Sequence, residues 1–254
     1  MKKRFLTLLV LAANLLVFSS KAQDVLDTLR RKDADGWEFI QTRTRSNVVA
    51  AEWHLHNKVI EGVWASYWSL GYPKDMITYR NGIKDGVAMR IIEEGQVDFV
   101  EHYKDGKLEG PRRTYHIRGP IFEETYYSEG KKNGKYTRWY REGLKEAEGT
   151  YYNDRLDGKS TWYYKGEGKA TEFEYKDGEI DGDAVSYYRN GKVSELGGYK
   201  KSIKTGKWRE FYENGNPKSE GKYENNEKEG EWKQYNEKGE PVKSIKYAKG
   251  VEVK

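Results

Sequence analysis

The sequence of 254 residues contains no cysteine, and this absence removes several functions at once. Disulfide bonds, thiol nucleophiles and thiolate metal sites all require cysteine side chains. The fold must therefore be held together by packing and hydrogen bonds alone.

Aliphatic side chains are sparse, whereas 21 tyrosines and 27 glycines are present and the mean hydropathy is −1.02. A compact two-layer domain needs more leucine, isoleucine and valine to fill the space between its layers. The composition therefore indicates a thin structure that is wet on much of both faces.

Motifs that carry catalytic chemistry are also missing. The sequence has no Gly-x-Ser-x-Gly, His-Glu-x-x-His or phosphate-binding loop. His54 and His56 share a face of one expected strand, while His102 and His116 follow no common pattern. Two solvated histidines near the end of an array explain the first pair better than a metal site does. We predict that the protein is not an enzyme and has no cofactor and no metal.

The N-terminus has the layout of a secretory signal peptide. Basic residues at 2–4 precede the uncharged run FLTLLVLAANLLVF at 5–18, and the small residues Ser20 and Ala22 stand just before a cut at Gln23. The run is short for a membrane span, and no cysteine follows it, which excludes a lipoprotein anchor. We predict that residues 1–22 are removed on export, so that the protein is periplasmic, envelope-associated or extracellular.

The formal net charge of +5 comes mostly from that segment. Loss of its four basic residues leaves a balance of +1, with the two signs interspersed. Such a near-neutral chain gives no support for nucleic-acid binding and argues against an attraction to anionic lipid.

A period of 24 residues organises the rest of the chain. Tyrosine recurs at every such step from Tyr79 to Tyr247, and a ring recurs at all but one step from Tyr67 to Tyr235. The accompanying glycine column, which we expect to be an obligatory turn position, consists of Gly62, Gly86, Gly110, Gly134, Gly158, Gly182, Gly206 and Gly230. The columns stay in register over about eight units without an insertion or deletion, so the chain is a repeat protein.

Each unit is predicted to contain two short antiparallel strands and two tight turns. In GKWREFYENGNPKSEGKY (206–223), Asn214-Gly215 separates two extended runs and predicts a hairpin in which both turn residues have positive φ. The stretch YKDGKLEG (103–110), nearly repeated as YKDGEIDG (175–182), is then the return turn between hairpins. The predicted fold class is all-β, an elongated single-sheet meander of stacked β-hairpins with about sixteen strands.

Three segments result from this division. Residues 1–22 are the signal peptide, residues 23–54 are a linker and N-terminal cap, and residues 55–254 are the repeat array. Within the cap, DVLDTLRR (24–31) is compatible with a short helix.

The runs NGKYTRWYREG, GKWREFYENG and GEWKQYNEKG are each followed by a Tyr-x-x-Gly-type turn. They resemble bacterial MORN-type repeats (membrane occupation and recognition nexus), especially the variant in YwqK-family antitoxin-like proteins. The resemblance covers about residues 55–254 and implies rows of β-hairpins in an elongated, non-enzymatic sheet that binds proteins or phospholipids. An antitoxin role fits an exported protein only as periplasmic immunity.

Candidate binding residues follow from the alternation along the first strand of each unit, in which Tyr79 and its equivalents are position 1. Positions 10, 12 and 14 share a face opposite the ring at position 13, and this face is aromatic in the middle of the array. Exposed rings in a row suit a protein partner, although rings that merely cover the second face of a thin sheet give the same pattern. The Tyr79 and Tyr67 columns are expected to be structural ladders. The candidate partner-binding residues are Tyr140, Tyr164, Tyr188, Tyr212, Trp162 and Trp208.

The predicted function is therefore a non-enzymatic one. We expect an exported repeat protein that acts as an interaction scaffold or binding module in the cell envelope, with an unidentified protein as its partner. The alternatives are a phospholipid or membrane-surface binder, a carbohydrate-binding module and a periplasmic immunity or antitoxin protein.

Overall fold

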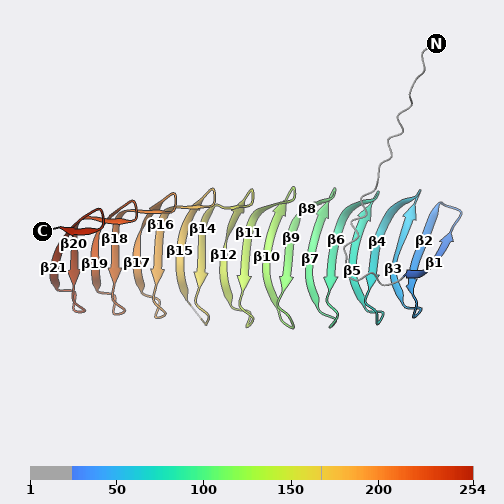
Figure 1. Ribbon diagram of the computed structural model, residues 1–254, viewed down its shortest axis with the longest axis horizontal. Coiled ribbons are helices and arrows are strands. Elements are labelled where there is room, and N and C mark those ends of the chain that lie inside the picture. Colours follow the sequence, from blue (N-terminus) through green and yellow to red (C-terminus); the bar gives the residue numbers. More distant parts are fainter. Residues whose placement is uncertain (1–24, 167, 254) are drawn as a thin grey trace, which may run out of the picture.

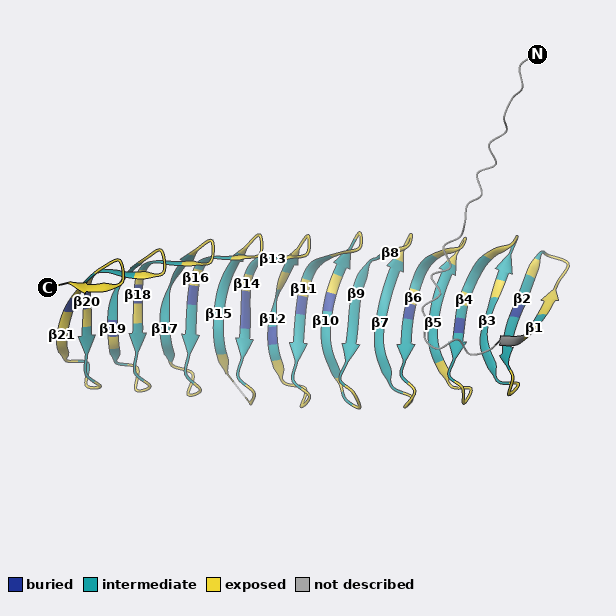
Figure 2. Cartoon of the chain, viewed as in Figure 1, coloured by how far each residue is buried: buried dark blue, intermediate teal, exposed yellow. Residues whose placement is uncertain are grey.

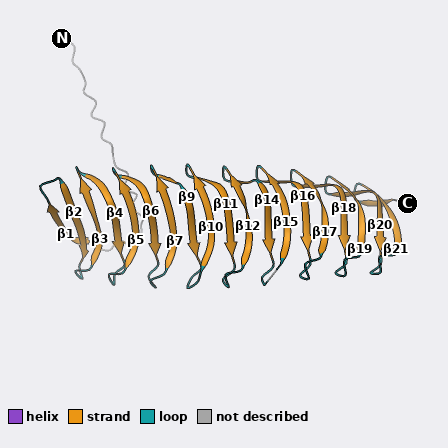
Figure 3. Cartoon of the chain, turned by 180° about the vertical axis from the view of Figure 1, so that it is seen from behind, coloured by secondary structure: helices purple, strands orange, loops and turns teal. Residues whose placement is uncertain are grey.

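The computed structural model describes residues 25–166 and 168–253, so the predicted signal peptide lies outside the described residues. Its 22 strands form one open sheet in which successive strands pair antiparallel (Figure 1). Seen from behind, the same row of hairpins has turns along both long edges (Figure 3). The all-β prediction of a single-sheet meander of stacked hairpins is confirmed.

The strands follow one another with short connections. They are β1 (Val25–Lys32), β2 (Trp37–Thr44), β3 (Val49–His56), β4 (Val59–Tyr67), β5 (Pro73–Arg80), β6 (Ile83–Ile91), β7 (Val97–Lys104), β8 (Lys107–Leu108), β9 (Gly110–Tyr115), β10 (Ile121–Ser128), β11 (Lys131–Trp139), β12 (Lys145–Tyr152), β13 (Arg155–Leu156), β14 (Gly158–Tyr163), β15 (Lys169–Lys176), β16 (Glu179–Tyr187), β17 (Val193–Lys200), β18 (Ile203–Phe211), β19 (Pro217–Glu224), β20 (Glu227–Tyr235), β21 (Pro241–Ala248) and β22 (Val251–Val253). The number exceeds the predicted sixteen because β1–β3 and β22 extend the sheet at its ends and because β8 and β13 are separated from β9 and β14.

The segment that we expected to contain a short helix is instead strand β1, which pairs with β2. An isolated helix of eight residues is marginal in water, whereas a strand at this place satisfies its backbone groups against β2. Strands β2 and β3 form a hairpin whose turn, closed by Thr44 N–H on Val48 O, has the hydrogen bonds of the later turns. The predicted division between residues 54 and 55 falls inside β3.

The two kinds of turn differ from the prediction in one respect. In the return turn Asp105 and Gly106 both have positive φ, 49° and 80°, as a two-residue hairpin turn requires. At Asn214-Gly215 only the glycine does, and the loop is closed by Gly215 N–H on Tyr212 O and by Tyr212 N–H on Asn216 O. This is a three-residue loop with a glycine bulge, so the predicted pair of positive φ values is wrong there.

The Gly62 column has a different role from the obligatory turn that we expected. All eight glycines have positive φ, but they lie inside or at the start of a strand. At Gly134 the pairing slips, because Thr125 and Tyr127 oppose Tyr136 and Lys132, which are twice as far apart in the chain. The column therefore forms a β-bulge that bends each unit, and glycine supplies the left-handed conformation.

Neighbouring units are also joined along the return-turn edge. The N–H of Gly106 donates to Lys84 O of the preceding unit at 2.9 Å, and other units repeat this bond. An acidic side chain one residue before the bulge glycine accepts a further turn N–H, as Glu61 does from Asn81 at 2.6 Å. Glu109 and Glu229 accept the equivalent N–H groups of the next units at 2.8 Å. These acids therefore connect units as well as carrying surface charge.

The two faces of the sheet are distinguished by which side chains meet. Face A carries positions 1, 10, 12, 21 and 23 of each unit, since Tyr136 contacts Tyr151 and Trp162 contacts Phe173. Face B carries positions 9, 11, 13, 22 and 24, since Arg113 pairs with Glu124. Fully buried residues are scattered along the sheet (Figure 2), as expected for a single layer. The main core cluster lies on face A around Trp208 and Trp232, with the ladder of Tyr199, Tyr223 and Tyr247 packed against it.

Candidate binding surfaces

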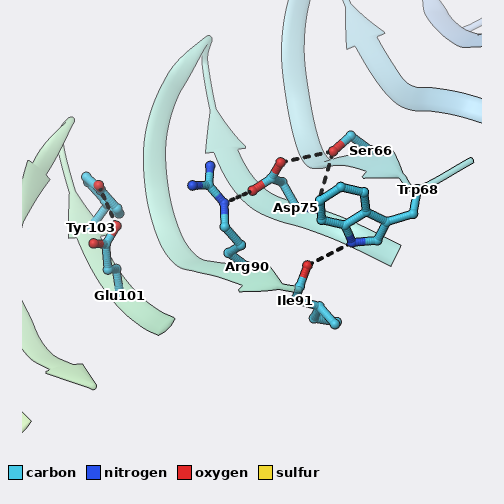
Figure 4. Close-up of polar contacts among 7 residues, drawn as sticks. All are labelled: Ser66, Trp68, Asp75, Arg90, Ile91, Glu101 and Tyr103. Carbon is cyan, nitrogen blue, oxygen red and sulfur yellow. Dashed lines mark hydrogen bonds and ion pairs between the residues drawn. The ribbon is translucent and has the colours of Figure 1, made fainter. Parts of the chain in front are cut away.

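The position-14 residues, which include four of the candidate tyrosines, connect neighbouring units along the hairpin-turn edge. Each hydroxyl donates to a backbone carbonyl 23 residues later, and each ring is half-buried. The bonds are Tyr140 to Tyr163 O at 2.9 Å, Tyr164 to Tyr187 O at 2.6 Å, Tyr188 to Phe211 O at 2.6 Å and Tyr212 to Tyr235 O at 2.8 Å. Trp68 makes the same connection to Ile91 O (Figure 4). These tyrosines therefore have a structural role that the sequence did not indicate.

The candidate Trp208 is wrong as a partner-binding residue, because its side chain is only 2% exposed. The indole lies between Tyr199 and Tyr223, with ring centroids 5.3 and 5.7 Å away, and Lys204 Nζ lies 3.9 Å from its ring centroid. Gly197 leaves the space that the indole occupies, since a Cβ there would lie 2.1 Å from it. The position-1 tyrosines share face A with position 10 and enclose the ring. The candidate Trp162 is half-buried on the same face against Phe173.

The ring at position 13 lies on face B, where its hydroxyl donates to a glutamate 15 residues earlier. The bonds are Tyr67 to Glu52 at 2.6 Å, Tyr187 to Glu172 at 2.5 Å, Tyr235 to Glu220 at 2.9 Å, and Tyr163 to Glu148. Burial, and secondly the bonded glutamate, raise the pKa of Tyr67, Tyr163 and Tyr187 to about 12. The column therefore bonds adjacent strands on face B, in agreement with the structural role expected for it.

Face A of the first half combines rings such as Trp64 and Phe99 with ion pairs. Asp75 accepts from Ser66 at 3.2 Å and pairs with Arg90 at 2.7 Å, and Tyr103 donates to Glu101 at 2.8 Å (Figure 4). The Glu101 carboxylate also pairs with Arg112 at 2.8 Å. At position 10, Arg112 thus stands where Trp208 and Trp232 stand farther along the chain.

Face B of the same strands is apolar instead. We call its central side chains the face-B patch, and they are Val63, Ala65, Met76, Val87, Met89 and Val100. They lie on the adjacent strands β4–β7, and Val63 and Val87 are 45% and 44% exposed. At position 9, where these two valines stand, later units carry Lys135, Lys159 and Lys207. The patch was missed from the sequence, although this change within one column is the signal that marks it.

A second group of exposed apolar side chains lies at the tips of the hairpin turns. We call it the turn-edge group, and it consists of Leu70, Tyr72, Ile117 and Leu144. Leu70 and Ile117 are each 74% exposed. The corresponding turns of the second half end in polar residues such as Asn190 and Asn214.

The histidines and acidic side chains form no site for metal chemistry in the described residues. In the described parts of the chain, no group of three or more His, Asp or Glu side chains is placed to hold a metal ion. His56 stacks on Trp37 at 4.7 Å, and His54 contacts Phe39 at 5.1 Å, so both belong to an aromatic cluster on face B. Residues 25–166 and 168–253 also contain no helix with the length and apolar character needed to cross a membrane.

The fold defines a single-layer β-hairpin repeat protein. Residues 180–201 and 204–225 match the family model of the MORN repeat variant, which confirms the resemblance for these residues. The match covers parts of β16–β20, and the same turns and bulge glycines recur from β4 onward. The matched residues thus resemble MORN repeats, which indicate a repeat-based binding module. No curated protein matches the chain.

Proposed function

We propose that the protein is an exported, non-enzymatic binding module that holds a protein partner along its hairpin-turn edge. The observation that carries this proposal is the turn-edge group, in which large apolar side chains are exposed at the tips of three turns of an otherwise constant scaffold. Binding residues concentrate on loops that a rigid framework positions, and grouped exposed apolar side chains favour protein contacts.

The framework holds these turns in place before a partner arrives. The turn at Leu70 is closed by Trp68 N–H on Tyr72 O at 2.8 Å, and the Trp68 indole bonds to the next unit. A preorganised loop loses less conformational entropy on binding than a free one. Since one unit advances about 10 Å, the tips of Leu70, Ile117 and Leu144 span on the order of 30 Å, which suits a specific protein interface.

Export is the part of the proposal that rests on the N-terminal segment alone. The basic residues, the apolar run and the small residues before Gln23 support secretion, which places the partner in the envelope or outside the cell. Intact mass of the fractionated protein should show a chain that begins at Gln23. Full-length protein in the cytosol would contradict export and favour a cytoplasmic antitoxin.

The partner surface is tested by a triple substitution, Leu70→Ser, Ile117→Ser and Leu144→Ser. Because these side chains are exposed, the melting temperature should change little, while capture of a partner from envelope extract should fall at least tenfold. The matched control is Glu213→Ser, Glu237→Ser and Lys238→Ser at turns of the second half, which should retain capture. Equal capture by the triple variant, or binding of the wild type to protein-free phospholipid vesicles, would overturn the proposal.

A further inference from the structure

We propose that two copies of this chain associate face to face through the face-B patch. The dimer has a two-fold axis that runs parallel to the strands between β5 and β6. It leaves the hairpin-turn edge accessible, so it is independent of the function proposed above.

The patch is a continuous apolar row across four adjacent strands. Ala65 pairs with Met76, Met76 with Met89, and Met89 with Val100, and all four side chains lie on face B. Val63 and Val87 border this row on the side of the return turns, while Ile91 and Val97 border it on the side of the hairpin turns. Valine, methionine and isoleucine side chains gain free energy when they leave water, and this row is partly open to water.

The other face of the same strands carries both rings and ion pairs, such as Trp64 beside Ile77 and Asp75 with Arg90. Face B of these strands is covered by no other element of the described chain, because the sheet is a single layer. A second sheet packed about 10 Å away in the aligned arrangement would supply a second layer.

The charges at the two ends of the row identify the occupant as a second copy. Glu52 pairs with Ala65 at one end of the row, and Arg113 pairs with Val100 at the other. Both lie the same number of strands from the proposed axis. Rotation about that axis places Met76 on Met89 of the second copy, Ala65 on its Val100, and Glu52 on its Arg113. An isologous interface requires such self-complementarity.

Both charged groups keep bonding capacity for this contact. Glu52 accepts from Gln41 at 3.0 Å and from Tyr67 at 2.6 Å, and a carboxylate has about four acceptor sites. Arg113 uses its Nε on Glu124 at 2.5 Å, and its guanidinium has further N–H donors. A salt bridge to the second copy therefore adds to the present bonds and does not replace them.

The available area agrees with a specific dimer. From Gln41 in β2 to Glu124 in β10 the row crosses eight neighbouring strands, or about 38 Å, and five residues of strand cover about 17 Å. The product is on the order of 650 Å² per copy, within the range of roughly 600–1,000 Å² per partner for standard interfaces. In the second half the apolar part of this row is shorter, because only Val185 and Leu196 stand between Glu172 and Arg209.

Two complementary charge reversals test the geometry by sedimentation velocity of the purified protein. Glu52→Arg alone and Arg113→Glu alone each create like charges at both ends of the interface. Each should raise the dimer Kd by about 100-fold, a factor of ten for each contact. An equimolar mixture of the two variants should restore dimers, because a mixed pair has opposite charges at both ends. Native mass spectrometry would identify the restored dimer as one copy of each variant.

The chain offers matched controls on face B of its second half. Glu148 accepts from Tyr163 as Glu52 does from Tyr67, and Arg209 pairs with Glu220 as Arg113 does with Glu124. Glu148→Arg and Arg209→Glu should therefore leave the dimer intact. If a charge-reversal variant fails to fold, Val87→Lys can replace it. Lysine already occupies this position of the repeat at Lys135, so the sheet tolerates it, and the added charge in the apolar patch should dissociate the dimer. The proposal would be overturned if the wild-type protein stayed monomeric at about 100 μM. It would also be overturned if the mixture of the two charge-reversal variants stayed monomeric.

Discussion

The first half of the sheet carries an apolar row on face B, whereas the second half has its main core cluster on face A. In β4–β7 the methionines and valines lie on face B, and ion pairs such as Asp75–Arg90 lie on face A. In β16–β21 the rings of Trp208 and Trp232 lie on face A, and charged pairs such as Arg209–Glu220 lie on face B. One backbone repeat therefore supports either arrangement.

This exchange is allowed because the elements that define the repeat do not depend on either face. The return turns, the bulge glycines, the acid at Glu61 and its equivalents, and the position-14 side chains all act between units or within the backbone. Face composition is then free to vary along the array. We infer that the second half is stabilised by its own rings and that the first half depends more on what covers it.

The largest expected effect compares Trp208→Ala with Arg112→Ala, since both residues occupy position 10 of face A. Loss of a buried tryptophan typically costs about 3–5 kcal/mol, because a cavity is added to the lost transfer free energy. The partly exposed Arg112–Glu101 pair should be worth under about 1 kcal/mol. Denaturant titrations followed by circular dichroism would measure both losses. Similar losses would show that the side chain at position 10 contributes equally to the stability of both halves.

A second prediction concerns the adjacent residues Gly197 and Gly198. A Cβ at Gly197 would lie 2.1 Å from the Trp208 ring, so Gly197→Ala should cost about 1–3 kcal/mol through overpacking. At Gly198 the nearest atoms are backbone oxygens at 3.8 and 3.9 Å, and Gly198→Ala should be neutral or stabilising by up to about 1 kcal/mol. Thermal melts of the two variants provide the comparison. A large loss at Gly198 would mean that the enclosed ring is not the reason for glycine.

The sequence was sufficient for the fold because the 24-residue register fixes strands and turns in every unit. It was insufficient for the faces, because alternation relates residues within one strand only. The bulge at the Gly62 column intervenes between the Tyr79 column and position 10, so their common face became evident only from contacts such as Tyr136–Tyr151. For this reason Trp208 was predicted to be exposed, whereas its side chain is buried.

Bonds between units were equally hidden from the sequence. The Tyr188 hydroxyl reaches a carbonyl 23 residues away, and carbonyls carry no sequence signal. The same limit applies to Asn214-Gly215, where the dipeptide predicts a turn but the length of the loop is decided by which backbone groups pair. For β1 the neighbouring strand β2 decides between strand and helix.

A third prediction uses the position-14 column to compare the halves. Tyr188→Phe removes a 2.6 Å hydrogen bond to Phe211 O and should cost about 1 kcal/mol. Ile92 occupies this position in the first half without a hydroxyl. Ile92→Tyr should raise the free energy of unfolding by up to about 1 kcal/mol, because its hydroxyl can donate a hydrogen bond to the Tyr115 carbonyl. Melting temperatures would report both shifts. No gain at Ile92 would indicate that the edge of the first half has a different geometry.

The smallest expected effect is a loss of stability at alkaline pH that both halves share. Burial, and then the hydrogen bonds to Glu52 and Glu148, raise the pKa of Tyr67 and Tyr163 to about 12. A raised folded-state pKa means that the stabilisation is complete below pH 10, where the free phenol is neutral, and is lost as the pH rises towards 12. Tyr67→Phe in the first half and Tyr163→Phe in the second should each reduce the decline between pH 10 and 12. Denaturant midpoints at pH 9.5 and 11.5 would measure this decline. An effect at Tyr163 but none at Tyr67 would mean that the contrast between the halves extends to the ring at position 13, whereas equal effects would confine it to the side chains at positions 9, 10, 11, 22 and 23.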